Sequence, residues 1–490
     1  MNPFPWLSLL ISLPLVGALL VWVGGGRWAR SIATGCAVAT LGVALGVAGR
    51  FEPGVGTFQL VERHAWMPSL HSAYLVGVDG ISLPFLPMIA LLFVATILAG
   101  WHHAQRPLSR LHFALLLFLE GVTLGIFCAL DTVLFFLFWE LTLIPIYFLV
   151  SLWGVGPNRR HAASKYTLYM LAGGAPLLFG LLLPALSDPG GMVFDLTELL
   201  ARPLPPERQG MVFFLLLVGF GVKIPLVPLH AWLPTLALEG PVGVTAIMTG
   251  VKLGAYGLIR FVLPLAPDVA REYHWLLAGL GVVAIIYGGL AALAQSNLRR
   301  MLAFSSISHV GLVVLGVSSF TLQGVQGALY QLLNFTLTAG GLFLLGGFLH
   351  QRLGSTDLVH MGGLVRPLPW VATFFLLFGL AGMGMPLTSG FPGELLLLVG
   401  VFQAHTGSGL AALGGVILGA GCFFSFFRQG FLGPLGRHVP GELPPLLLRE
   451  WLVLIPFGVL ILLGGVYPSA LLDVTHASAQ HWLTSRVAPR

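Results

Sequence analysis

Apolar segments of about 20 residues recur along the whole chain, and this feature limits the fold more than any other. A helix needs about 20 apolar residues to cross the hydrocarbon core of a bilayer. Of the 490 residues, 57% are hydrophobic and only 9% are charged, whereas a soluble domain carries about 25% charged residues. The sequence therefore predicts an all-α, polytopic membrane protein that is embedded in the lipid bilayer.

A hydropathy window of this length predicts about 14 transmembrane helices. The first apolar segment lacks the basic region of a signal peptide and is too long for its apolar core, so we interpret it as the first of these helices. The predicted spans cover approximately residues 4–23, 29–49, 77–100, 111–130, 131–153, 163–186, 209–229, 240–263, 275–295, 302–319, 325–349, 368–403, 408–428 and 450–472.

Two of the spans contain residues that break helices. The stretch "VKIPLVPLHAWLP" (222–234) has three prolines, and "GMGMPLTSGFPGELLLL" (382–398) has two prolines and four glycines. In lipid such breaks persist only where they are buried in protein or line a wet cavity. They fall in spans 7 and 12, five spans apart, which indicates two inverted five-helix repeats, as in many transporters.

This pattern divides the chain into four predicted parts. Residues 1–110 hold helices 1–3, residues 111–263 the first repeat, residues 275–428 the second, inverted repeat, and residues 429–490 helix 14 and the tail. Arginines number thirteen in the loops on one side and eight on the other. Because basic loops face the cytoplasm, both termini are expected on the outer side.

A few charged residues lie inside the apolar segments. The chain has only three lysines: Lys165 lies near the edge of a span, whereas Lys223 and Lys252 lie within spans. Unlike arginine, a desolvated lysine can release its proton near neutral pH. A charge at the bilayer centre costs at least about 2.5–3.5 kcal/mol, so these residues are expected to pair with other charges or face a hydrated interior.

Buried acids complete the candidate set. Glu140 stands in "FFLFWELTLIPIYFL" (135–149), Glu394 follows the break in span 12, and Glu120 lies in span 4. A row of acidic and basic groups is what a proton relay requires, and we take Glu140, Lys223, Lys252 and Glu394 as that relay. Secondary candidates for the proton path are Glu120, His230, His309 and Lys165.

Each candidate also has a structural interpretation. Glu140, Lys223 and Lys252 could form satisfied ion pairs, and Glu394 could cap the second half of a broken helix. His230 and His309 could be satisfied core residues. For Asp79, at the start of span 3, a structural role at a helix N-terminus is favoured.

Other chemistries find little support. The three cysteines, Cys36, Cys128 and Cys422, are isolated in apolar segments, which argues against an iron–sulfur cluster or structural zinc. The acids and histidines show no metal-ligand spacing, so we expect no metal and no cofactor in this chain. The formal charge of +6 comes from short loops, and no nucleic-acid motif accompanies it.

Several of these stretches resemble the M subunit of bacterial NADH–quinone oxidoreductase, respiratory complex I. They occur in the family's order over nearly the whole chain: "GVDGISLPF", "FFLFWELTLIPIYFLVSLWG", "KIPLVPLHAWLP", "KLGAYGLIRF", "RRMLAFSSISHVGLVVLG", "GFPGELLLL" and "LREWLVLIPFGVLILLGGVYPSALLD". The L, M and N subunits of that complex share one fold with Mrp-type cation/proton antiporters. A Glu at position 394 is similar to M, whereas the others usually have Lys there.

The resemblance implies a proton-translocating subunit of an enzyme that couples electron transfer from NADH to quinone to proton pumping. Each repeat would hold a half-channel; Glu140 would pair with Lys223, Lys252 would carry the proton towards the centre, and Glu394 would pass it outward. The expected location is the bacterial inner (plasma) membrane, beside the L and N subunits. FMN, the iron–sulfur clusters and the quinone site would belong to other subunits, and no nucleic acid is expected.

Three positions depart from the family. Phe335 stands where a His is thought to link the two half-channels, so water or a neighbouring residue must substitute for it. Thr235 and Asn297 each stand where Asp is usual. Alternatives therefore remain: an Mrp-type antiporter subunit, a membrane subunit of an energy-converting hydrogenase or formate-linked complex, a specialised paralogue, or a scaffold that has lost transport.

Overall fold

The computed structural model describes residues 4–24, 26–101, 108–187, 191–202, 204–437, 439–440 and 442–484. The two ends, residues 1–3 and 485–490, lie outside the described residues, so the expected outer position of the termini stays a prediction. Within the described residues, eleven helical segments are long and apolar enough to cross a membrane. Three shorter apolar helices, α3, α18 and α19, add to them. The predicted helical, multi-span architecture is thus confirmed.

Among the described residues, the first half of the chain holds eleven α-helices. Their bounds are α1 Trp6–Gly24, α2 Ala29–Ala48, α3 Phe85–Ala99, α4 Ser109–Cys128, α5 Thr132–Leu141, α6 Leu143–Trp153, α7 Arg159–Ala185, α8 Leu196–Ala201, α9 Pro206–Lys223, α10 Trp232–Glu239 and α11 Val242–Gly250.

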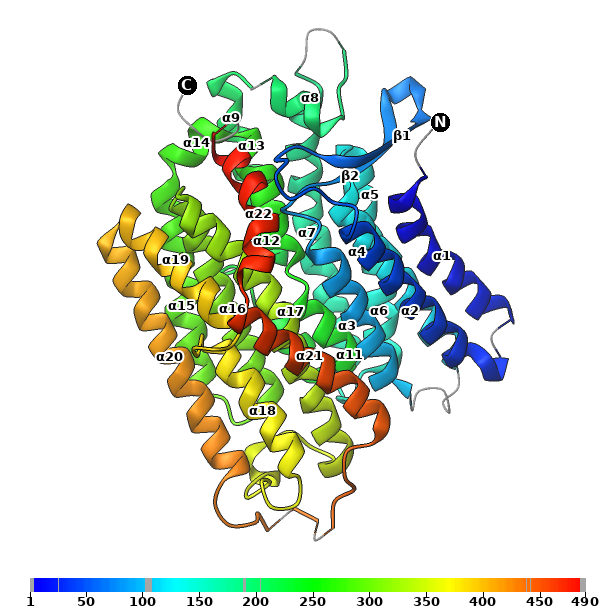
Figure 1. The fold of residues 1–490 in the computed structure, drawn as a ribbon, viewed down its shortest axis with the longest axis vertical. Helices are drawn as coiled ribbons and strands as arrows, with labels where there is room; N and C mark the ends of the chain where they lie inside the picture. The colour runs from blue at the N-terminus through cyan, green and yellow to red at the C-terminus, as the bar shows by residue number, and fades with distance from the viewer. Residues whose placement is uncertain are drawn as a thin grey trace.

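The helices of the second half follow, and the long ones among them, such as α15, α16, α17 and α20, run side by side (Figure 1). Their bounds are α12 Leu253–Gly257, α13 Leu263–Leu265, α14 Pro267–Glu272, α15 His274–Leu293, α16 Leu298–Ser318, α17 Leu322–Leu353, α18 Pro369–Gly382, α19 Gly390–Ala404, α20 Thr406–Phe431, α21 Leu448–Val466 and α22 Ser469–Trp482.

Both predicted breaks are present. Span 7 is interrupted between α9, which ends at Lys223, and α10, which begins at Trp232. Trp232 donates from Nε1 to the carbonyl oxygen of Val222 at 2.9 Å, and so satisfies an acceptor at the broken end of α9. Span 12 consists of α18 and α19, separated by residues 383–389. Proline and glycine supply these interruptions, as the sequence predicts.

Span 8 contains a third break, which the sequence analysis missed. α11 ends at Gly250, Lys252 has a non-helical backbone, and α12 begins at Leu253. A π-helical turn follows over Leu258–Val262. Such turns inside helices are rare and are frequently found at functional sites. The break places the backbone of a buried lysine at a helix terminus.

A two-stranded antiparallel hairpin stands between α2 and α3 and was also not predicted. Strand β1 covers Gln59–Met67 and strand β2 covers Ser72–Val78. The carboxylate of Asp131 holds the hairpin to α5: it caps α5 through the amides of Val133 and Leu134 and accepts from the Ser72 hydroxyl and the Ala73 amide. The hairpin and α22 lie at the same end of the helix bundle (Figure 1).

The long helix α17 forms the centre of the bundle. It packs against α11, α16, α18 and α19, and most of its length is buried. The span helices α1, α2 and α20 are covered much less. Within the described residues, α17 contributes several buried polar side chains, among them Gln331 and Asn334.

Candidate functional site

Lys223 is the last residue of α9, at the break in span 7, and its side chain is 7% exposed. Its ammonium donates a hydrogen bond to the hydroxyl of Thr142 at 3.0 Å and lies 4.0 Å from the ring centroid of Trp139. Thr142 separates α5 from α6. This buried cation is therefore held by a neutral hydroxyl and an aromatic face, an attractive arrangement in a desolvated site.

Glu140 lies near Lys223 without contacting it. The two interact electrostatically, but in the part of the chain that the structure describes no ion pair joins them at 4.0 Å or less. The Glu140 carboxylate packs against Gly174 of α7, where an added Cβ would lie 2.6 Å from Oε1. A side chain at position 174 would therefore displace the acid.

Lys165, on α7, contacts α10, the helix that follows the same break. Its ammonium donates to the Thr235 hydroxyl at 3.0 Å, so the threonine that departs from the family contacts a basic group. His230 lies inside the break and contacts the Tyr287 hydroxyl through Nε2 at 3.1 Å. Lys165 also acts electrostatically on His230. Two secondary candidates thus lie together at the broken span.

Lys252 occupies the break in span 8 and is 8% exposed. Its ammonium donates to the Ser306 hydroxyl of α16. A cavity of about 20 Å³ is lined by both Lys223 and Lys252, together with Thr142. A cavity needs roughly 10–15 Å³ to hold a water molecule, so the cavity that both lysines line has room for one water.

His309 lies one turn along α16 from Ser306 and faces the departure at position 335. Its ring stacks on Phe335 with centroids 5.2 Å apart and planes 20° from parallel. The Lys252 ammonium is 6.0 Å from the Phe335 ring centroid and interacts electrostatically with His309. An imidazole from α16 therefore stands beside the position where the family usually has one on α17.

Glu394 lies in α19, directly after the break in span 12, and is 7% exposed. Its carboxylate fills the space beside Gly384, where an added Cβ would meet Oε2 at 2.1 Å. Gly384 has a φ of +66°, a conformation that favours glycine. The break thus makes room for the acid, which also interacts with Gln331 of α17.

Two amide side chains on α17, those of Gln331 and Asn334, extend from this acid along the helix. Neither was predicted from the sequence. Asn334 donates to Gln331 Oε1 at 2.9 Å and accepts from the Ser389 hydroxyl at 2.7 Å. Gln331 in turn donates to the carbonyl oxygen of Gly390 at 3.1 Å. Two uncharged polar residues three apart in an apolar segment were the available signal, because they share one face of a helix.

Glu120 lies apart from the other candidates. It is fully buried in α4, and neither carboxyl oxygen has a hydrogen-bond partner. It acts electrostatically on Cys36 of α2 and not on Lys223 or Lys252. A place in the relay is therefore not supported by its position.

Asn297 has a structural role at the start of α16. Its side-chain oxygen accepts from the amides of Arg299 and Arg300, and its amide donates to Asp357 at 2.8 Å. An aspartate could cap the helix equally well, but it could not donate to Asp357. Asn297, which departs from the family, thus suits its neighbour Asp357 better than an aspartate would.

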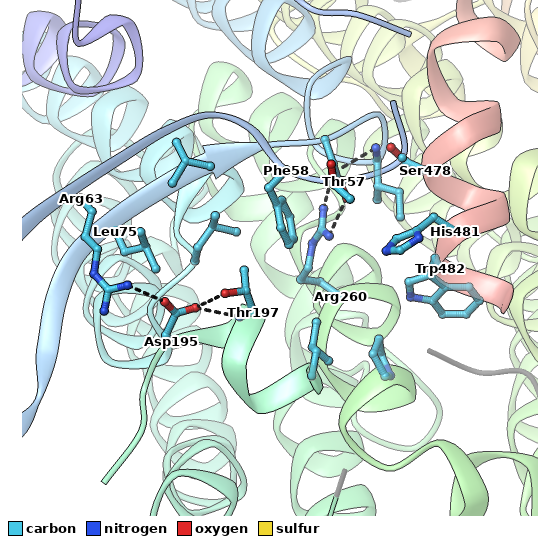
Figure 2. A pocket seen from close by; sticks show the side chains of 17 residues that line it. Thr57, Phe58, Arg63, Leu75, Asp195, Thr197, Arg260, Ser478, His481 and Trp482 are labelled. Carbon is cyan, nitrogen blue, oxygen red and sulfur yellow. Dashed lines mark hydrogen bonds and ion pairs between the residues drawn. The ribbon is translucent and has the colours of Figure 1, made fainter. Parts of the chain in front are cut away.

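A larger pocket of about 370 Å³ opens beside the hairpin, between β1, α8 and α22 (Figure 2). At its base Arg260 binds Asp79 with two hydrogen bonds, of 2.8 and 2.5 Å. Burial alone would raise the pKa of Asp79, but the guanidinium more than offsets this and the pKa lies below its ordinary value. Asp79 also accepts from the amides of Ile81 and Ser82, in agreement with the structural role expected for it.

Comparison with known proteins places these features in a family. Residues 129–419 match the family model described as "NADH:quinone oxidoreductase/Mrp antiporter, TM". NADH-quinone oxidoreductase subunit M of Rickettsia typhi is 32% identical over 496 residues, which cover 99% of each chain. NAD(P)H-quinone oxidoreductase chain 4 1 of a Synechococcus strain is 38% identical over 445 residues, 88% of this chain and 84% of that protein.

Solved structures agree with the sequence relatives. A chain of respiratory complex I from Thermus thermophilus with bound NADH matches with a TM-score of 0.91 and 31% identity, covering 99% of this chain and 100% of that one. The Mrp complex from Dietzia sp. matches with a TM-score of 0.85 and 22% identity, covering 98% of this chain and 52% of that one, and shows a likeness of fold. The chain is therefore a multi-pass membrane protein that belongs to the transmembrane family of NADH:quinone oxidoreductase and Mrp antiporter subunits, as an antiporter-like subunit of the M type.

Proposed function

We propose that this chain moves protons across the membrane as part of an NADH–quinone oxidoreductase complex, through Glu140, Lys223, Lys252 and Glu394. Electrons would pass through other subunits, which would hold FMN, the iron–sulfur clusters and the quinone site. The neighbouring L and N subunits would be its partners in the membrane arm. The bacterial plasma membrane would be its location, with both termini on the outer side.

One observation carries the proposal: two arginines with buried side chains, Arg260 and Arg352, have charged partners, whereas the two relay lysines have neutral ones. Buried Arg260 forms a two-point ion pair with Asp79, and Arg352 does the same with Glu450. By contrast, the hydrogen bonds from Lys223 and Lys252 go to neutral hydroxyls. Arginine keeps its proton, whereas lysine can give it up when desolvated. Ion pairs thus stabilise the fold at the arginines, and the lysines remain free to exchange protons.

The first half of the relay runs from Glu140 to Lys252. Glu140 interacts electrostatically with Lys223 without a direct contact, so its influence can vary with small movements of the broken helix. The cavity that Lys223 and Lys252 both line can hold one water molecule, through which a proton can pass. Lys165 and His230 lie where protons would enter this half.

The second half runs from Lys252 to Glu394. Phe335 cannot transfer a proton, but His309 stacks on it and interacts with Lys252. Beyond His309, the amide side chains of Asn334 and Gln331 would lie along the proton path to Glu394. We propose that His309 takes the place of the missing histidine on α17.

The domain division predicted from the sequence fits this path. Residues 111–263 would form the first repeat and half-channel, and residues 275–428 the second, inverted repeat and half-channel. Each contains a broken helix that carries a relay residue: Lys223 is the last residue of α9 in the first, and Glu394 lies in α19 in the second. Residues 1–110 and 429–490 would flank them.

The test is proton pumping by NADH-energised vesicles that carry Glu140→Gln. Proton transfer by a positioned side chain contributes about 10²–10⁴-fold in rate, so we expect pumping to fall at least about tenfold. NADH–artificial-acceptor activity should stay normal, because it reports assembly alone. Glu120→Gln is the matched control, since it removes another buried acid that lies away from the relay, and it should leave pumping intact.

Other outcomes would change the assignment. Normal pumping by the Glu140→Gln variant would contradict the relay and leave Glu140 a structural ion. Proton exchange that needs Na⁺ and not NADH would favour an Mrp-type antiporter. The Mrp complex from Dietzia sp. contains a chain of similar fold. Hydrogenase or formate-oxidising subunits purified with the chain would favour the corresponding complex.

A further inference from the structure

Two histidines from distant parts of the chain meet at the surface. His274 is the first residue of α15, and His405 separates α19 from α20. Their Nε2 atoms are 3.1 Å apart, and their ring centroids are 5.2 Å apart with planes 9° from parallel. The proposed relay uses neither residue, although His405 directly follows the helix that carries Glu394.

The second nitrogen of His274 is held by the backbone. Its Nδ1 lies 2.7 Å from the carbonyl oxygen of Arg271. A carbonyl oxygen only accepts, so Nδ1 carries the proton and the neutral ring presents a bare lone pair at Nε2. Histidines that bind metals are usually oriented in this way, with the non-ligating nitrogen donating to a carbonyl or carboxylate. The Nε2 of His274 lies 3.1 Å from the Nε2 of His405.

The spacing of the two nitrogens suits one metal ion. Zinc binds imidazole nitrogen at about 2.0–2.1 Å. Two nitrogens 3.1 Å apart at that bond length subtend about 100° at the ion, between the octahedral and tetrahedral angles. Imidazole ligands suit zinc, copper and nickel ions. His274 is half-buried and His405 is exposed, so water can reach the remaining positions.

We propose that His274 and His405 form an exchangeable two-histidine site for a divalent transition metal ion of the Zn²⁺ class. No group of three or more His, Cys, Asp or Glu residues gathers for a metal within the described part of the chain. Waters therefore complete the coordination, and the ion binds reversibly and is not a structural metal.

The site has a consequence for transport, which rests on the proposed function. α15 packs against α16, which carries His309, and against α20. An ion held by His274 and His405 ties the start of α15 to the end of α19, the helix of Glu394. Any movement of α19 during proton transfer is then restrained, so bound Zn²⁺ slows turnover.

The direct test is Zn²⁺ binding to the detergent-purified complex, measured by competition with a chromophoric chelator. The wild-type complex should bind one more Zn²⁺ in the micromolar range than complexes carrying His274→Ala or His405→Ala. His476→Ala removes an exposed histidine elsewhere and should leave this binding unchanged. With Cu²⁺ as the probe, the electron paramagnetic resonance spectrum should show nitrogen couplings that either substitution removes.

Turnover gives a second, separable result. Micromolar Zn²⁺ should slow NADH–quinone turnover of the wild-type complex severalfold and should affect the two alanine variants much less. Equal Zn²⁺ binding by wild type and both variants would overturn the site and leave the histidines as a hydrogen-bonded pair. Binding without inhibition would establish the site and refute its link to α19. Because binding does not depend on proton transfer, it should persist in the Glu140→Gln complex even if the proposed function fails.

Discussion

The buried ion pair between Asp79 and Arg260 permits a quantitative prediction about stability. Both residues are 4% exposed, and the guanidinium donates two hydrogen bonds to the carboxylate. Replacing Asp79 by Ala leaves the Arg260 charge buried without its partner. Removing one partner of a buried pair costs about 3–5 kcal/mol.

Arg260 keeps some favourable contacts after this change. It donates to the Tyr256 hydroxyl at 3.2 Å and lies 5.1 Å from the Phe58 ring centroid. We therefore expect a loss near the lower limit, about 3 kcal/mol, which changes the ratio of folded to unfolded protein roughly 150-fold. The loss can be measured by denaturing the detergent-solubilised chain with increasing SDS and following tryptophan fluorescence.

A double variant separates this explanation from a simple packing defect. Asp79→Ala with Arg260→Met removes both charges and keeps an apolar side chain of similar length. Because hydrophobic replacements of buried ion pairs are often neutral or stabilising, the double variant should regain most of the lost stability. A double variant less stable than Asp79→Ala alone would refute the reasoning.

The same pair has a signed pH dependence. Since the pKa of Asp79 is lowered in the folded chain, the pair contributes its full stability above the ordinary pKa of about 3.9 and loses it as the pH falls through the lower, folded pKa. The stability difference between wild type and Asp79→Ala should therefore be constant from about pH 7 to 5 and shrink below about pH 4. A difference that shrinks already between pH 7 and 5 would contradict this.

Two further substitutions test the local geometry. Gly384→Ala places a Cβ against Glu394 at a φ of +66°, a backbone conformation that costs an L-residue about 1–2 kcal/mol. It should lower vesicle pumping several-fold, whereas Gly382→Ala, with open space around it, should not; equal pumping by both would show that the acid does not need this space. Asn297→Asp puts a carboxylate 2.8 Å from Asp357 and removes the donor to its Oδ1, while the Ser355 hydroxyl still donates to Oδ2. The chain should lose about 1–3 kcal/mol of stability in SDS denaturation, and an unchanged midpoint would mean that the contact is unimportant.

The sequence predicted the membrane architecture well because its signals are local. Apolar length determined most spans, and proline with glycine marked the breaks at α9–α10 and α18–α19. The break at Lys252 was missed because no proline lies beside it. Gly250 and Gly254 flank it, and an added Cβ on Gly254 would meet the Ile224 backbone nitrogen at 2.6 Å. That constraint comes from the tertiary structure and leaves only a weak trace in the sequence.

The candidate site was predictable in its charged residues and not in their partners. The lysines and acids are conspicuous in apolar segments, yet the hydroxyls that hold the lysines, Thr142 and Ser306, lie 81 and 54 residues away in the chain. His309 was named only as a secondary candidate, because its stacking on Phe335 depends on how α16 and α17 pack. Pairings of this kind are set by the crossing of helices, which hydropathy does not encode.

The unbroken length of α17 has a mechanical consequence. Its 32 residues make a rod about 48 Å long, well beyond the roughly 30 Å thickness of the hydrocarbon core. One end is fixed to α21, where buried Arg352 donates two hydrogen bonds to Glu450 at 3.0 and 2.6 Å. Such a rod shifts as a whole or not at all. We therefore expect α17 to stay fixed during proton transfer. The interrupted helices beside it, α11–α12 and α18–α19, would make the small local movements that accompany each transferred proton.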